Sequence, residues 1–132
     1  MLTYRTLKLA VIPFAFIAAS CSSPQQVSFT QDVHPILAQN CISCHHAPNG
    51  QGYLASGLNL TSYQTLMKGT KYGPVVVPGS AIGSTLVRLI RHEADPSIAM
   101  PRNHHPGEPA NWLAPSQIHL IAQWINQGAK DN

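Results

Sequence analysis

The clearest periodic pattern of apolar residues lies near the end of the sequence. Apolar side chains recur there at the i, i+3, i+4 and i+7 spacing of one α-helical face, at Ile118, Ile121, Ala122 and Ile125. Pro115 suits the first helical turn, where an N–H is unpaired in any case, and Gly128 is expected to end the helix. Leu120 and Trp124 widen the apolar face, and Trp124 is expected to pack against the first helix.

That first helix is predicted over Ser28–Asn40. Its apolar stripe consists of Phe29, Val33, Ile36 and Leu37. Ser28 and Gln31 match a capping box, with Thr30 as a rival cap. Pro35 removes one backbone hydrogen bond and is expected to kink the helix early.

The middle of the sequence predicts short elements between loops. Residues 47–59 contain one proline and three glycines and predict a loop. Thr61–Lys68 predicts a short helix capped by Thr61 and ended by Gly69. Residues 72–79 predict a short strand or an extended loop. A third helix, begun by Ser80 or Ser84 and running to about His92, is predicted with Leu86, Leu89 and Ile90 facing inward.

The N-terminal twenty residues have the pattern of an export signal. Arg5 and Lys8 precede a short apolar run over residues 9–18, and Ala19-Ser20-Cys21 follows. The run is too short for an uncleaved membrane anchor. It resembles a bacterial lipoprotein signal, which implies a lipid on Cys21, a tether over residues 21–27 and a location on the periplasmic side of a membrane. Ordinary cleavage, with Cys21 left as a thiol, is the alternative.

Composition and charge then narrow the classes of function. The 132 residues include only 10% charged residues, with 9 Gly and 11 Pro, and the formal net charge is +3. Without residues 1–20, six basic side chains remain against five acidic ones. The sequence has no Lys/Arg block, so nucleic-acid binding is not expected. With so few charges and so many turn residues, a bound group is expected to contribute to the core.

The chemistry is concentrated in Cys41-Ile42-Ser43-Cys44-His45, the C-x-x-C-H attachment signature of c-type haem. In a helical segment Cys41 and Cys44 are one turn apart on one face, so each thiol can add to a vinyl group of the same porphyrin. His45 can then bring an imidazole nitrogen under the iron. His46 is expected either to be exposed to solvent or to support His45 without binding the iron itself.

Three other interpretations of the cysteine pair have less support in the sequence. A thiol–disulfide redox site usually sits in a βαβ pattern, which is missing here. A zinc site would need a second pair of ligands. A structural disulfide between residues three apart would constrain the unfolded chain little.

Met100 is the best candidate for the second axial ligand. It is followed by Pro101, which favours an extended Met100 in a loop. Met67 is expected to fill the core instead. Two histidines in the Pro-rich stretch after Arg102, His104 and His105, are the rivals, either as a bis-His ligand or as a second metal site.

The order of these motifs resembles a mono-haem class I cytochrome c, most closely the planctomycete-type cytochrome c domain. The matching residues are Phe29, Asp32, Val33, Pro35, Ile36, Leu37, Asn40, Cys41, Cys44, His45, Leu58, Leu60, Val77, Pro78, Gly79, Ser84, Leu86, Met100, Pro101, Trp124, Ile125, Gly128 and Ala129. The resemblance implies an all-α domain over residues 28–132, with long loops around one covalent haem c. It also implies His45 and Met100 as axial ligands. Residues 102–112 depart from the pattern, being longer and richer in His and Pro.

The expected function is electron transfer between a donor and an acceptor protein, by a membrane-tethered carrier rather than an enzyme. No acid–base pair or nucleophile is evident in the sequence. A ligand-binding or peroxidatic haem protein is the alternative, and it would need a displaceable sixth ligand. A module that docks to a larger enzyme is a third possibility, compatible with the first.

Overall fold

The computed structural model describes residues 25–102 and 112–132. They form a π-helical turn and five short α-helices. The elements are η1 (Phe29–Val33), α1 (His34–Asn40), α2 (Gln51–Ser56), α3 (Tyr63–Lys68), α4 (Thr85–Ile90) and α5 (Pro115–Asn126). Within these two ranges the only β-pairing is an isolated bridge between Thr70 and Gly73. The all-α fold class expected from the sequence is confirmed.

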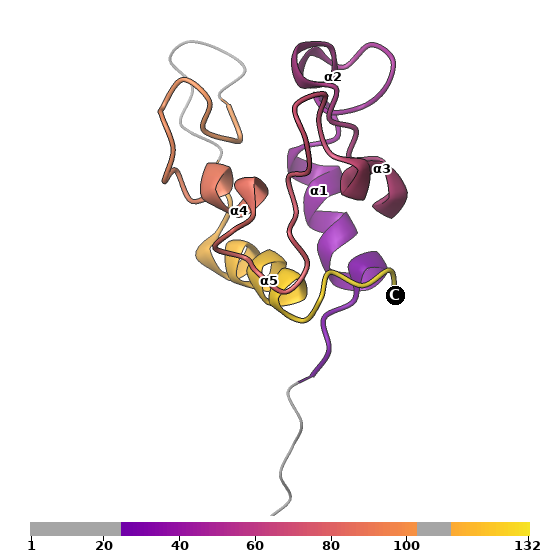
Figure 1. The fold of residues 1–132 in the computed structure, drawn as a ribbon, viewed down its shortest axis with the longest axis vertical. Coiled ribbons are helices and arrows are strands. Elements are labelled where there is room, and N and C mark those ends of the chain that lie inside the picture. The colour runs from indigo at the N-terminus through magenta and orange to yellow at the C-terminus, as the bar shows by residue number, and fades with distance from the viewer. Residues whose placement is uncertain (1–24, 103–111) are drawn as a thin grey trace, which may run out of the picture.

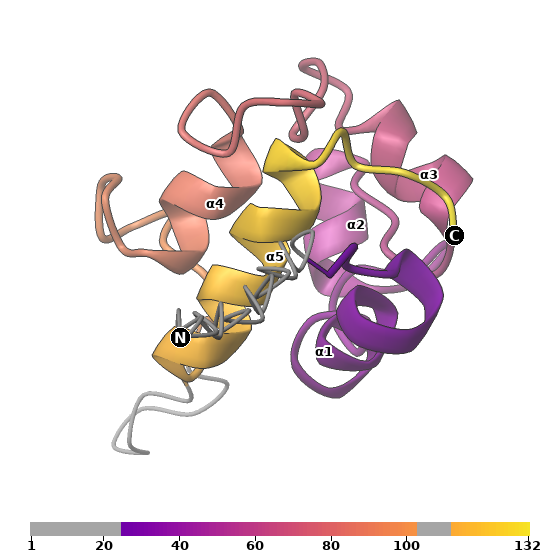
Figure 2. The same ribbon diagram turned by 90° about the horizontal axis from the view of Figure 1, so that it is seen from below.

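Helix α5 forms the base of the described structure. Helix α4 lies on one side of it, and α1 and α3 lie on the other (Figures 1 and 2). The α5 face predicted from the sequence is the buried one, with Ile121 and Ile125 both fully buried. Gly128 follows the helix with a positive φ of 102°, a conformation that glycine adopts without strain.

The predicted first helix is split into two parts. A π-helical turn over Phe29–Val33 leads into α1, and Pro35 lies in the first turn of α1 rather than in a helix interior. Ser28 is the cap, and its Oγ accepts from the N–H of Gln31 at 3.1 Å. Asp32, not Gln31, completes the cap by accepting from the Ser28 N–H at 2.8 Å. The Gln31 half of the predicted capping box is therefore wrong.

Aromatic contacts join η1 to α5. The Phe29 ring lies 5.4 Å from the Trp124 ring and 5.4 Å from the Tyr63 ring. The polar ends of the two partners are satisfied by backbone carbonyls, since Trp124 Nε1 donates to Lys130 and Tyr63 Oη donates to Ala129. Buried aromatic groups of this kind combine a large apolar area with a hydrogen bond. The packing predicted for Trp124 is confirmed.

Two predictions in the middle of the sequence are wrong. Residues 47–59 are not all loop, because α2 occupies Gln51–Ser56. Helix α3 begins one residue later than predicted, since Ser62 and not Thr61 accepts from the Thr65 N–H. Gly69 ends α3 as expected.

The segment before α4 is extended and forms no strand. Ser84, rather than Ser80, precedes α4, and its buried Oγ accepts from the Val77 N–H at 2.8 Å while donating to the Ser80 carbonyl. The Leu86 N–H donates to the Val75 carbonyl. The extended segment is thereby fixed along α4. In the part of the chain that the structure describes, no helix is long and apolar enough to cross a bilayer.

Candidate cofactor site

The C-x-x-C-H motif begins where α1 ends. Cys41 is the residue after the helix, and its N–H still donates to the Leu37 carbonyl. The N–H groups of Cys44 and His45 both donate to the Cys41 carbonyl, at 3.1 and 2.9 Å. This tight turn keeps the two sulfurs and the imidazole in one short segment. The His45 carbonyl accepts from the Leu60 N–H, which attaches the segment to the following loop.

The four residues predicted to hold a haem line one cleft. Cys41, Cys44, His45 and Met100 all contribute to its surface, and its volume is about 700 Å³. That volume falls within the roughly 300–1,000 Å³ of cofactor and ligand sites. The walls are largely apolar, and Arg102 is the only Lys, Arg, Asp or Glu among the described residues that line it.

The cleft has two walls from distant parts of the sequence. One wall carries the cysteine motif and α2. The other carries α4 and residues 98–102, on the opposite side in Figure 1. Met100 belongs to this second wall, where its N–H donates to the Leu89 carbonyl at 3.2 Å. The fold therefore brings a thioether to the cleft that also holds an imidazole 55 positions earlier in the sequence.

His45 is buried, with 9% of its surface exposed. Burial lowers its pKa, while the Leu58 backbone acts in the opposite direction. No group of the described protein meets Nδ1 at hydrogen-bonding geometry. A buried imidazole whose pKa is lowered stays neutral, which is the form that binds a metal.

Gly52 on α2 lies directly against the imidazole of His45. A Cβ at this position would be 2.6–2.8 Å from Cε1, Nε2 and Nδ1 of the ring. Gly50 is equally constrained, because a Cβ there would collide with the backbone of Cys44 and His46. The two glycines thus allow α2 to pack closely on the motif. The sequence signal for this role was the glycine pair itself, which indicated a loop instead.

The cysteine thiols are half-buried at the edge of the cleft. Burial raises the pKa of Cys41 to about 11, and the charge of a neighbouring Cys44 thiolate acts in the same direction. At neutral pH Cys41 is therefore a protonated thiol. A protonated Cys41 thiol is a poor ligand for a metal cation, which needs a thiolate.

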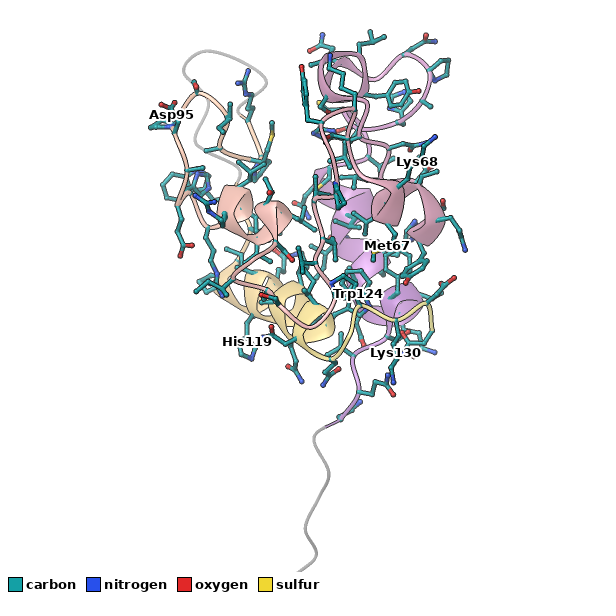
Figure 3. All side chains as sticks on the ribbon, in the orientation of Figure 1. Met67, Lys68, Asp95, His119, Trp124 and Lys130 are labelled. Atoms are coloured by element: carbon teal, nitrogen blue, oxygen red, sulfur yellow. The ribbon has the colours of Figure 1, made fainter. Side chains whose placement is uncertain are left out.

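The other candidate ligands lie elsewhere. His46 does not line the cleft, and its Nδ1 lies 2.9 Å from the Ile42 carbonyl oxygen. Met67 packs against the hydrophobic core as expected, and Figure 3 shows it beside α1, across the molecule from Asp95. His104 and His105 lie outside the described residues, as does Cys21.

The sequence and the fold were compared with known proteins. Residues 41–103 match the family model described as planctomycete cytochrome C. No curated protein matches the sequence. Among solved structures, the hydrazine synthase of Kuenenia stuttgartiensis has a similar fold, with a TM-score of 0.51 and 24% identity over 78% of this chain. This chain corresponds to only 16% of the length of that one, and at this identity the likeness concerns the fold.

The matched segment is similar to the cytochrome c domain of the planctomycete type. Such domains imply a covalent haem c and are usually extracytoplasmic electron carriers rather than enzymes. The described residues fit that group, because a buried imidazole, two cysteine side chains and a thioether share one apolar cleft.

Proposed function

We propose that this protein transfers electrons through one haem c, attached by thioether bonds to Cys41 and Cys44 and ligated by His45 and Met100. The observation that carries the proposal is the common cleft of these four residues, which come from two separate segments of the chain. When bound, the haem supplies a one-electron couple at its iron. The protein supplies the ligands, an apolar environment and restricted access of water.

The identity of the two ligands supports a carrier over a ligand-binding or peroxidatic haem protein. Imidazole and thioether together fill both axial positions and favour a high reduction potential. The backbone hydrogen bond from Met100 to Leu89 fixes the Met100 loop to α4, which makes the sixth ligand hard to displace. No electron-transfer step requires an acid, a base or a nucleophile from the protein.

The proposal includes export and a lipid anchor. Residues 1–20 would be removed as a lipoprotein signal, Cys21 would carry the lipid, and residues 21–27 would join it to the domain over 28–132. Support comes from the sequence of the signal and from the cofactor, since haem is attached to such motifs outside the cytoplasm. The carrier would then work on the periplasmic side of a bacterial membrane.

Haem staining after denaturing electrophoresis tests the attachment. The full-length protein, produced with a haem-attachment system, is expected to keep its haem on the gel, because thioether bonds survive denaturation. A variant with Cys41→Ala and Cys44→Ala is expected to lose it. Haem that persists in this double variant would contradict the proposal.

Cys21→Ala is the matched control for the two cysteine substitutions. It is expected to keep the covalent haem but to leave the membrane fraction. Loss of membrane association without loss of haem would show that Cys21 anchors the protein, whereas Cys41 and Cys44 attach the haem. A Cys21→Ala protein that stays in the membrane fraction would contradict the lipid anchor alone.

A further inference from the structure

The N-terminal chain joins the folded domain at a hydrogen-bonded clamp beside the end of α5. The Val27 N–H donates to Gln127 Oε1 at 2.7 Å, and Gln127 Nε2 donates to the Gln25 carbonyl. Asn132 completes the clamp, since its Oδ1 accepts from the Phe29 N–H and its carbonyl accepts from Ser28 Oγ. Val27 itself is buried in the core, so the chain that leads to Cys21 is held at a fixed point.

The haem cleft lies at the opposite end of the molecule. None of its described lining residues comes from residues 25–39 or from 113–132. Its walls are instead formed by α2, α4 and the segments around residues 70–75 and 98–102. In Figure 1 the first described residues, 25–28, lie at the bottom, below α5, while α2 and the loop after α4 lie at the top. Figure 3 shows the same separation between Lys130 at the lower end and Asp95 at the upper end.

The length of the tether limits how the domain can lie on a membrane. Six residues from Cys21 to Val27 span at most about 22 Å, at about 3.6 Å per residue. A folded domain of about 100 residues has a radius of gyration of about 13 Å, which corresponds to a sphere about 33 Å across. With a lipid on Cys21, the clamp therefore cannot rise far enough for the opposite end to face the bilayer.

We propose that the anchored protein holds the mouth of its haem cleft away from the membrane and exchanges electrons with a water-soluble protein, not with a quinol dissolved in the bilayer. Each exchange moves one electron between the partner's redox centre and the haem iron, with no bond formed. This inference rests on the proposed function, because it requires both the haem and the anchor at Cys21.

The rim of the cleft fits a protein partner with an uncharged contact surface. Tyr72 and Ile98 line the cleft and are 81% and 50% exposed. Arg102 is the only Lys, Arg, Asp or Glu among the described lining residues. Apolar contact with little charge pairing predicts an association that salt weakens only slightly.

The test compares two positions of the anchor on the mature haem-loaded protein. In one preparation a maleimide lipid is attached to Cys21. In the other, Cys21→Ser removes that site and Leu54→Cys supplies a new one on α2, at the cleft end. Leu54 is 67% exposed and does not line the cleft. Both proteins are placed on phosphatidylcholine vesicles that contain a long-chain quinol, and haem reduction is followed by absorption. Each quinol that is oxidised reduces two protein molecules and releases two protons.

The protein anchored at Cys21 is expected to be reduced by the quinol at least about tenfold more slowly than the Leu54→Cys protein, since a linker that cannot span two sites removes the advantage of tethering. A cuprous blue-copper protein in solution, chosen after the midpoint potential is measured, is expected to reduce the Cys21-anchored protein at least as fast as the other. Quinol rates that differ by less than tenfold, or a blue-copper donor that is slower with the Cys21 anchor, would overturn the orientation.

Failure of the proposed function would look different. A protein without covalent haem shows no haem spectrum before any vesicle is added. A protein that is not lipidated in cells is recognised by its absence from the membrane fraction. Once haem is attached, the chemical anchor at Cys21 lets the orientation be measured whether or not cells lipidate the protein.

Discussion

Gly52 packs against the imidazole ring of His45, at a distance that leaves no room for a Cβ atom. The contact places α2 directly behind the proposed axial ligand. It also explains why a glycine occurs inside a short helix, where it usually costs up to about 1 kcal/mol relative to alanine.

Gly52→Ala is therefore expected to destabilise the protein, although the same change in an open helix would stabilise it. A Cβ 2.6–2.8 Å from three ring atoms forces His45 or α2 to move, at a cost of roughly 1–3 kcal/mol. Urea unfolding of the haem-loaded protein measures the cost, and the absorption spectrum reports the disturbed ligand. Leu54→Ala, at an exposed position of the same helix, is the control and should change neither. A Gly52→Ala protein as stable as the wild type would show that the contact is not tight.

Arg102 is expected to raise the reduction potential. A fixed positive charge at the cleft disfavours the ferric iron, which carries one more positive charge than the ferrous iron. Arg102→Gln should therefore lower the midpoint potential, by an amount on the order of tens of millivolts because Arg102 is exposed and screened. Redox titration measures the shift. Arg91→Gln removes an exposed charge that does not line the cleft, and an equal shift in both variants would refute a specific role for Arg102.

Cys41 is expected to be unreactive at neutral pH in the protein without haem. Because its folded pKa of about 11 is above the ordinary value of 9.0, the protonated thiol is favoured by folding. The corresponding stability is fully present below pH 9 and is lost as the pH rises to 11, by at most about 3 kcal/mol.

Alkylation by iodoacetamide, followed at Cys41 by mass spectrometry, measures this pKa because only the thiolate reacts. The rate at Cys41 should rise with a midpoint near pH 11. A midpoint near pH 9 would show that the thiol is not buried in the haem-free protein. In the haem-loaded protein the thioether has no proton to lose, so the alkaline loss of stability that Cys41 causes should disappear.

Phe29 and Trp124 are expected to stabilise the fold jointly. Their rings lie 5.4 Å apart, and such pairs contribute about 0.5–1.5 kcal/mol beyond the burial of each side chain. A double-mutant cycle with Phe29→Leu and Trp124→Phe measures this coupling in urea. A cycle with Phe29→Leu and the exposed Leu54→Ala is the control and should be additive within about 0.5 kcal/mol. Additivity in the first cycle would mean that the two rings do not interact.

The parts of the fold that were predictable have strong local signals. Helix α5 combines an apolar stripe with Pro115 and Gly128 at its ends, and its bounds follow from those residues. Helix α2 was missed for the opposite reason, since it buries none of its side chains fully and contains Gly52. Its position depends on contact with His45, which no local pattern reveals. The second half of the Ser28 cap was also missed, because the Asp32 carboxylate and not the Gln31 side chain accepts from the Ser28 N–H.

The residues of the site also differ in how well the sequence alone predicts them. The spacing of Cys41, Cys44 and His45 in one short segment indicates its chemistry directly. Met100 is separated from them by 55 residues or more, so its position in the same cleft depends on the packing of α4 and was expected only from the Met-Pro motif and the family resemblance. Gly52 and Arg102 were not predicted, because only the folded chain brings them to the cleft.

The most direct test of the proposed function is absorption spectroscopy of the haem-loaded protein in both redox states, with and without carbon monoxide. The wild type is expected to show a six-coordinate haem in both states and to bind carbon monoxide slowly. Met100→Ala should change both spectra and bind carbon monoxide rapidly when reduced, whereas Met67→Leu should behave as the wild type. Rapid binding by the wild type, together with unchanged spectra in Met100→Ala, would contradict ligation by His45 and Met100.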